Sequence, residues 1–220
     1  MENKVVRTTP RRRDPDLQEK VFEMKNPERV EEQWIDFTAE LNALDYLEKA
    51  YQYMYQVENS PMEWKSVILS LHGALYGFAV CVCHGTDWEN VNDAKKEGNY
   101  HLIGFKKVLS RCQDGEYMTA FGEVPLDLSE AQSVSIEKLK KFRDRFEHYM
   151  PMSWHIEVHG MPQIAIDALE VIRFLAVECS MWVRDRLKSK NVKIVKSLVY
   201  QSKKVLRKTQ LYKEARLVTD

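Results

Sequence analysis

Three polar side chains with the chemistry to act on a phosphate lie in the stretch RDRFEHYMPMSW, residues 143–154. A histidine such as His148 can take a proton from a hydroxyl group near neutral pH. A guanidinium such as that of Arg143 can hold a phosphate by two hydrogen bonds and offset developing negative charge. Asp144 could orient either group. The competing interpretation is a solvated helix side, with Arg143–Glu147 and Asp144–His148 as ordinary pairs four residues apart.

A helix must position these residues, and the sequence indicates where its core side lies. Pro151 is expected to end this helix, because proline lacks a backbone donor and disfavours helical geometry in the residue before it. On an ideal helix, Arg143 lies about 80° from the core direction, on the flank, while Asp144 and His148 lie roughly 180° and 140° away. The expected core stripe, with spacings of three, four and three, is Leu139, Phe142, Phe146 and Tyr149.

The stretch resembles the HEPN superfamily, helical-bundle proteins with an R-[N/D/H]-x-x-x-H motif, matched here by Arg143, Asp144 and His148. The longer run LKKFRDRFEHYMPMSWHIEVHGMP is similar to an uncharacterised bacterial group within that superfamily, and the similarity covers about residues 60–185. Asparagine is commoner than aspartate after the arginine. The resemblance implies metal-independent RNA cleavage by 2′-hydroxyl attack, with Arg143 and His148 as catalytic residues, Asp144 orienting one of them, and no cofactor.

The resemblance also implies an assembly, because HEPN ribonucleases typically build their cleft from two motifs. Only one motif is present, and Arg143 and His148 lie about 140° apart on one straight helix. We therefore expect a homodimer or a heterologous partner, with RNA as substrate. A nucleotidyltransferase antitoxin or another defence-system protein would fit a toxin or antiviral role. The alternative is a catalytically inactive helical binding or adaptor module that contacts RNA, a nucleotide or a partner protein.

Composition and start signals predict an all-α, HEPN-like up-and-down bundle of about five main helices. The chain has 220 residues, 33 basic and 33 acidic residues, and only 8 glycines and 7 prolines, a mixture that favours long helices. Asn26 before Pro27, and Ser60 with Pro61 and Glu63 as a capping box, indicate helix starts. The expected helices run from 26 to about 59, from 60 to 83, near 101–112, from Ser129 or Ser135 to Pro151, and from Pro162 to about Leu187, with 114–128 as loop.

Three regions are expected along the chain: a flexible basic and polar arm over 1–25, the bundle over 26–187, and a basic amphipathic helix and tail over 188–220. From Arg184 to the end there are twelve basic and three acidic residues, above apolar residues at helical spacing. This helix could bind RNA phosphates or pack on the bundle. A membrane surface is less well matched, because the helix lacks the tryptophans of a membrane anchor.

Two other groups of residues could bind a metal, and we expect neither to do so. His155, Glu157 and His159 share one side of a short extended segment over 154–159, but no fourth ligand is evident, which favours an exposed polar face. The CVCH run at 81–84 points its ligands in different directions on a helix. Cysteines at 81, 83, 112 and 179 are expected as reduced core thiols in a cytoplasmic protein. The apolar run SVILSLHGALYGFAVCVC, which contains the first two, is expected to be a buried helix rather than a membrane span.

Overall fold

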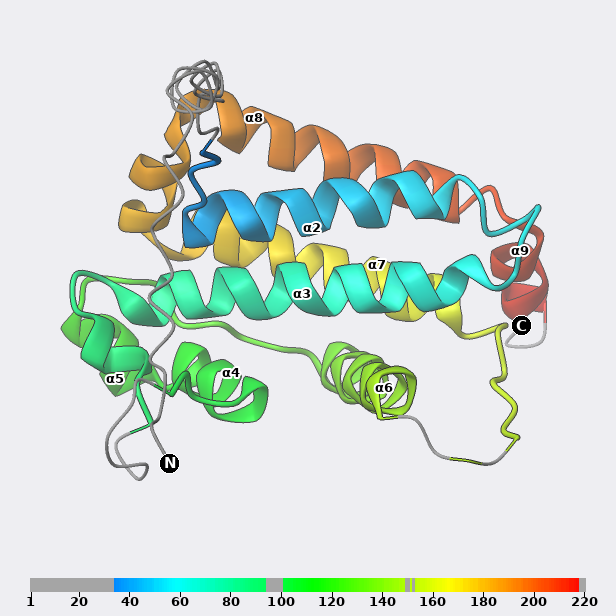
Figure 1. Cartoon of the computed structure of the whole chain (residues 1–220), viewed down its shortest axis with the longest axis horizontal. Coiled ribbons are helices and arrows are strands. Elements are labelled where there is room, and N and C mark those ends of the chain that lie inside the picture. The colour runs from blue at the N-terminus through cyan, green and yellow to red at the C-terminus, as the bar shows by residue number, and fades with distance from the viewer. Residues whose placement is uncertain (1–33, 94–100, 149–150, 152, 218–220) are drawn as a thin grey trace, which may run out of the picture. The chain divides into compact units, whose positions relative to one another are not determined.

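The computed structural model describes residues 34–93, 101–148, 151 and 153–217. Residues 37–220 belong to one compact unit, and its described part is helical, with no strand beyond a single bridge between Asn92 and Leu102. The all-α class is confirmed (Figure 1). The long helices are α2 (Ala39–Met54), α3 (Glu63–His84), α6 (Glu130–Glu147), α7 (Met161–Arg173) and α8 (Met181–Leu206), so the C-terminal basic helix is one of them and the helix expected near 101–112 is not. The shorter elements are a 3₁₀ turn (Trp88–Val91), α4 (Phe105–Gln113), α5 (Gly115–Ala120), a π-helical segment (Phe174–Cys179) and α9 (Gln210–Leu217).

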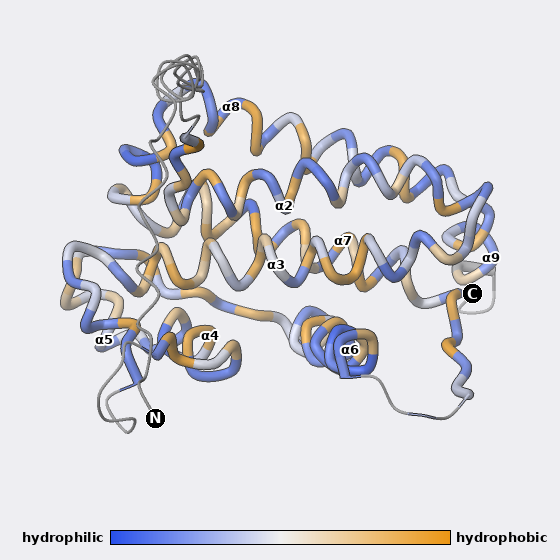
Figure 2. The backbone as a smooth tube through the Cα atoms, viewed as in Figure 1, coloured by the Kyte–Doolittle hydropathy of each residue, from blue (hydrophilic) through white to orange (hydrophobic). Residues whose placement is uncertain are grey.

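α3 is the central helix, and α2, α4, α6 and α7 pack around it. Its length and composition would suit a membrane span, but 72% of its apolar window is buried, as expected of a core helix. Gly77 allows α2 to approach closely, because a Cβ at this position would lie 2.8 Å from the Cβ of Ala43. Figure 2 shows the resulting division, with hydrophobic residues along α3 and hydrophilic residues on one side of α6.

The start of the first main helix differs from the prediction. α2 begins at Ala39, where the Thr38 hydroxyl accepts a hydrogen bond from the Leu41 N–H at 3.2 Å, and Asn26 lies outside the described residues. Trp34 and Phe37 stand at helical spacing from the apolar residues of α2, but they precede the helix and are 82% and 69% exposed. The threonine cap sets the boundary here, so the apolar spacing before it carries no helical meaning. The predicted arm over 1–25 also lies outside the described residues.

Two further boundaries were misjudged from sequence. Ser60 does not cap α3. Its carbonyl instead accepts a hydrogen bond from the Glu63 N–H at 3.0 Å in a tight turn, and the helix begins at Glu63. The stretch predicted as loop after residue 113 contains α5, because the Asp114 carboxylate accepts hydrogen bonds from the N–H groups of Glu116 and Tyr117, each at 3.0 Å. A side-chain cap thus starts α5, whereas α3 begins without one.

The single helix expected from Pro162 to Leu187 is two helices. α7 passes into the π-helical segment, and extended Ser180 then starts α8 by accepting a hydrogen bond from the Val183 N–H at 3.2 Å. The Ser180 hydroxyl also donates to a carboxylate oxygen of buried Glu123 at 2.8 Å, which ties the break to another part of the chain. The boundary expected near 187 appears within α8 as a kink at Lys188, with φ 62° and ψ 154°.

Candidate functional site

α6 holds the predicted site and begins where one of the two sequence signals placed it. Ser129 and Gln132 form a reciprocal capping box, with hydrogen bonds of 3.2 and 3.1 Å. Leu139 is fully buried, and Phe142 and Phe146 are partly buried against the core, so three members of the predicted stripe are confirmed. The fourth, Tyr149, lies outside the described residues.

α6 ends at Glu147, earlier than the expected stop at Pro151. A proline at 151 would have no N–H for the Glu147 carbonyl, and its ring would clash with that carbonyl if the helix continued. His148 therefore has extended backbone angles, φ −96° and ψ 95°, although its N–H still bonds to the Asp144 carbonyl at 2.9 Å. His148 is therefore the C-cap residue, whose N–H still belongs to the helix while its carbonyl does not.

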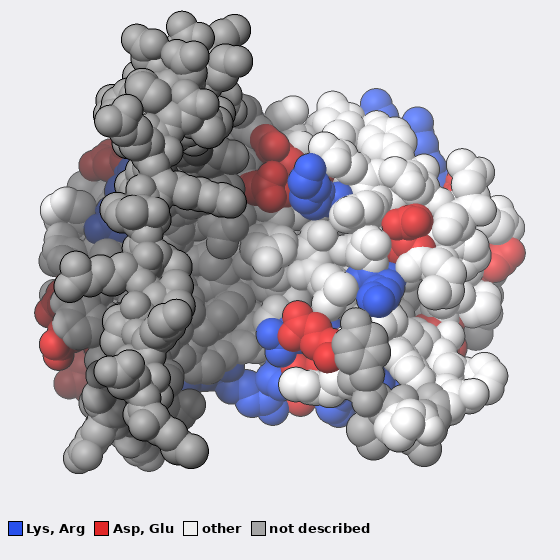
Figure 3. All heavy atoms as spheres, viewed as in Figure 1, with Lys and Arg blue, Asp and Glu red and all other residues white. Residues whose placement is uncertain are grey.

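Arg143 is held by carboxylates of its own helix. Its guanidinium donates to Asp144 Oδ1 at 3.1 Å and pairs with Glu147 Oε2 at 2.9 Å. The guanidinium side chain is 30% exposed, so solvent still reaches it. Acidic and basic side chains lie next to one another in the region of α6 in Figure 3. The expected Arg143–Glu147 pair is present, and it occupies only part of the donor fork.

Asp144 binds Lys140 and Arg143, one at each carboxylate oxygen. Burial acts to raise the pKa of Asp144, but the hydrogen bonds and positive charges of these two neighbours outweigh it and hold this pKa below its ordinary value. The carboxylate is 34% exposed, because α6 packs on both α3 and α7, so Asp144 is less outward than the helical projection predicted. The geometry suits a residue that orients Arg143.

His148 is exposed, and within the described part of the chain its side chain makes no hydrogen bond or ion pair. The predicted Asp144–His148 side-chain pair is absent, because Asp144 is occupied by the two cations. No side-chain contact of this kind joins His148 to Arg143 either. The three motif residues thus lie at one end of α6, but the structure brings together only Arg143 and Asp144.

His72 in α3 is a residue of this neighbourhood that the motif did not reveal. It is 4% exposed, its ring centroid lies 4.5 Å from that of Phe105, and its Nε2 has no hydrogen-bond partner among the described residues. Burial and the positive charges of Arg143 and Lys140 together lower the pKa of His72 to about 4, against the opposing charge of Asp144. The only sequence signal was a histidine interrupting an apolar helix.

The segment after the motif has no regular secondary structure and forms no sheet among the described residues. Ile156 and Val158 pack against the core, while Trp154 lies beside Phe146 with ring centroids 5.3 Å apart. The guanidinium carbon of Arg145 lies 5.9 Å from the Trp154 ring centroid, within cation–π range. Trp154 thus packs against the last turn of α6 and covers the side of the helix that carries Phe146.

The candidate metal group formed by His155, Glu157 and His159 contributes to packing between two segments. His159 Nδ1 lies 3.0 Å from Glu157 Oε1, and its Nε2 lies 3.6 Å from Glu214 Oε2 in α9. These contacts join the extended segment to α9, whereas His155 is exposed and does not share in them. Among the residues that the structure describes, no three histidine, cysteine, aspartate or glutamate side chains are arranged to hold a metal ion.

All four cysteines are buried and unpaired by disulfides. The sulfur atoms of Cys83 and Cys112 lie 3.5 Å apart between α3 and α4, and burial raises the pKa of Cys179 to about 12. A thiol with a raised pKa is a poor nucleophile near neutral pH. The cysteines therefore belong to the core and not to a reactive site.

Comparisons with known proteins assign no family: no family model, no curated protein and no solved structure matches the chain.

Proposed function

We propose that this protein is a metal-independent endoribonuclease whose active site forms when a second copy of the chain supplies a second motif. The observation that carries the proposal is the separation of roles at the end of α6. Arg143 is held at the surface with donors to spare, His148 extends beyond the helix without a side-chain partner in the described structure, and no contact joins them. Two groups that suit one reaction but do not meet in a protomer favour a composite site.

In the proposed reaction, His148 takes the proton of an RNA 2′-hydroxyl as its oxygen attacks the adjacent phosphorus. The new bond joins O2′ to phosphorus, and the bond from phosphorus to O5′ breaks. The protonated His148 of the second copy gives a proton to the departing 5′-oxygen, so the products are a 2′,3′-cyclic phosphate and a 5′-hydroxyl. Arg143 offsets the charge that gathers on the phosphate oxygens.

Arg143 can reach a phosphate at low cost. Its pair with Glu147 is partly exposed, at 30% and 45% for the two side chains, and exposed ion pairs contribute only about 0–1 kcal/mol. A phosphate can therefore replace Glu147, while Asp144 keeps its hold on the other guanidinium nitrogen. Asp144 is then a positioning residue, itself fixed by Lys140.

The test is RNA cleavage in EDTA by the purified protein and by His148→Ala and Arg143→Ala. Losses of about 10²–10⁴-fold for the histidine variant and 10²–10³-fold for the arginine variant are expected for a proton-transfer group and a charge-stabilising group. Asp144→Asn should retain most of the activity that Asp144→Ala loses, because the amide keeps a hydrogen bond to Arg143. Equal cleavage by the wild type and His148→Ala would refute the proposal.

Oligomeric state gives an independent check of the composite site. If two copies are needed, cleavage per mole of protein should fall on dilution in parallel with the dimer fraction measured by light scattering. Activity that is unchanged while the dimer dissociates would contradict the shared site. RNA binding without cleavage at any concentration would instead support the alternative, a helical binding module.

A further inference from the structure

The outer side of α8 carries a continuous row of positive charge. From Arg186 to Lys213 there are ten basic residues and no acidic residue. The side chains that are exposed between residues 190 and 208 fall within about 120° of the helix circumference and extend along roughly 25 Å. We call this row the basic face; it consists of Lys190, Lys193, Lys196, Tyr200, Lys204, Arg207 and Lys208.

The positive charges of the basic face are not neutralised within the described structure. Its six cations make no ion pair there, in contrast to Lys203, which points to the side of the helix and pairs with Glu170 of α7. Blue side chains stand along the edge of the molecule that α8 forms in Figure 3. Six unpaired cations in a row create a local field that attracts a polyanion, even though the whole chain is neutral.

From residue 190 onward the apolar side of α8 is already packed on the bundle, which distinguishes between the partners that this basic stretch can have. Val195, Val199 and Leu206 are buried against the bundle, and α8 packs on α2 and α7. The bundle-packing interpretation of this helix is therefore confirmed for its apolar side. A membrane-surface helix needs an apolar side to insert, and the basic face offers none. Phosphate groups of an extended polymer match what remains exposed.

Exposed tyrosines add a second kind of contact. Tyr200 lies in the middle of the basic face and is 64% exposed, so one face of its ring is open to a partner. Tyr55, at the end of α2, is 56% exposed beside the same stretch of α8. Aromatic rings between cations suit single-stranded nucleic acid, whose bases are free to stack on them while its phosphates meet the cations.

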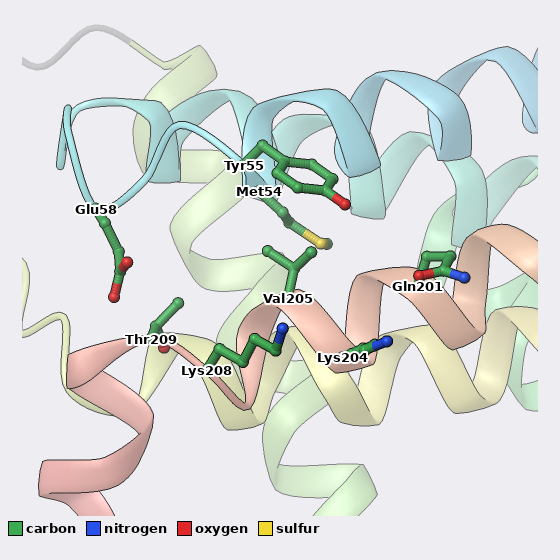
Figure 4. Close-up of a pocket in the computed structure, with 8 residues that line it drawn as sticks. All are labelled: Met54, Tyr55, Glu58, Gln201, Lys204, Val205, Lys208 and Thr209. Atoms are coloured by element: carbon green, nitrogen blue, oxygen red, sulfur yellow. The ribbon is translucent and has the colours of Figure 1, made fainter.

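A pocket of about 320 Å³ continues the basic face at the carboxyl end of α8. In Figure 4, Lys204 and Lys208 lie along one side of this pocket and Tyr55 on the other, above Met54 and Val205. Glu58 closes one end, where its carboxylate accepts a hydrogen bond from the Gln210 N–H at 2.8 Å. An apolar floor, an open tyrosine ring and two lysines are the contacts that a base with its phosphate would need.

We propose that the basic face of α8, together with this pocket, binds single-stranded nucleic acid. Phosphates lie along the cations, one base stacks on Tyr200 and another enters the pocket beside Tyr55. In Figure 1, α2, α3 and α7 separate α8 from α6, so this surface is distinct from the candidate cleavage site. It does not depend on cleavage, and it would serve the proposed ribonuclease by holding RNA on the protein.

The experiment measures the binding of a fluorescein-labelled 2′-O-methyl uridine 20-mer by anisotropy. This strand has no 2′-hydroxyl, so its binding is independent of the proposed cleavage. Six phosphate contacts at about 0.7 each give a slope near −4 for log affinity against log salt, or about a 300-fold loss from 50 to 200 mM. Lys204→Gln/Lys208→Gln should reduce the magnitude of this slope by about 1.4.

Matched variants distinguish binding by the basic face from a general attraction of nucleic acid to positive charge anywhere on the protein. Lys106→Gln/Lys107→Gln removes the same charge from α4 and should bind as the wild type does. Tyr200→Ala should weaken binding about fivefold or more, and Tyr200→Phe should restore it, because the phenyl ring still stacks. An unchanged slope in the α8 variant, an equal loss in the α4 variant, or tighter binding of a duplex than of a single strand would overturn the proposal. The same measurement with single-stranded DNA reports whether binding depends on the sugar of the strand.

Discussion

The buried His72 makes stability depend on pH in a way that the structure quantifies. Burial and the charge of Arg143 lower the pKa of His72 from 6.5 to about 4 in the folded chain. The unfolded chain therefore binds more protons than the folded chain between these two values, and the free energy of unfolding falls as the pH drops through this window. Below pH 4 both states are protonated, and the whole penalty of roughly 3 kcal/mol is reached.

The perturbation is His72→Leu, which removes the titrating group and also the Nε2 atom that has no partner in the described structure. Between pH 7 and pH 5 the wild type should lose about 2 kcal/mol through His72, and the variant should lack this loss. At pH 7 the variant should be about as stable as the wild type, because a leucine of similar size replaces a buried imidazole with an unmet hydrogen bond. Its relative stability should increase on acidification.

Urea unfolding at pH 7 and pH 5, followed by circular dichroism, measures the two free energies. His155→Leu is the control, since His155 is exposed, and it should keep the pH dependence of the wild type. The reasoning fails if the wild type and His72→Leu lose the same free energy between the two pH values. Such a result would mean that His72 is protonated as readily in the folded chain as in the unfolded one.

Three further predictions concern neighbouring contacts. Arg143→Gln should raise the pKa of the buried imidazole beside it, because a repelling charge is removed, and an NMR titration of that ring should move toward neutral pH. Arg186 contacts the buried Glu40 carboxylate at 3.2 Å, so Arg186→Met leaves that charge without its partner and should destabilise the fold by about 2 kcal/mol in urea unfolding. Adding Glu40→Met should recover most of this loss. Gly77→Leu should lower the melting temperature sharply and reduce the free energy of unfolding by about 1–3 kcal/mol or more, because the new side chain would clash with α2. Gly115→Leu is the control, since a Cβ there meets nothing within 4 Å, and it should change the melting temperature much less.

The parts of the fold that sequence could predict depend on contacts close in the chain. α3 follows from a predominantly apolar run, and the start of α6 from the Ser129 capping box, which is complete within four residues. The same reasoning placed the starts of α2 and α3 wrongly. α2 begins at the Thr38 cap, and α3 begins without a side-chain cap, after a turn in which Ser60 uses its carbonyl. The break at Ser180 also depends on a distant partner, Glu123.

The candidate site divides in the same way. Arg143 and its pair with Glu147 follow from helical spacing, and they are present. The conformation of His148 depends on how α6 ends, and the choice of Lys140 over His148 as the partner of Asp144 depends on that conformation. His72 lies about seventy residues away along the chain, so only the packing of α3 on α6 places it beside the motif. Periodicity along one helix contains no information about such a neighbour.

The basic face has a kinetic consequence as well as a binding one. Because the chain is neutral overall, the ten cations between Arg186 and Lys213 leave an equal excess of acidic residues over the rest of the sequence. The positive charge concentrated along α8 attracts a negatively charged strand before any contact forms. This attraction weakens as salt shortens the range of the field.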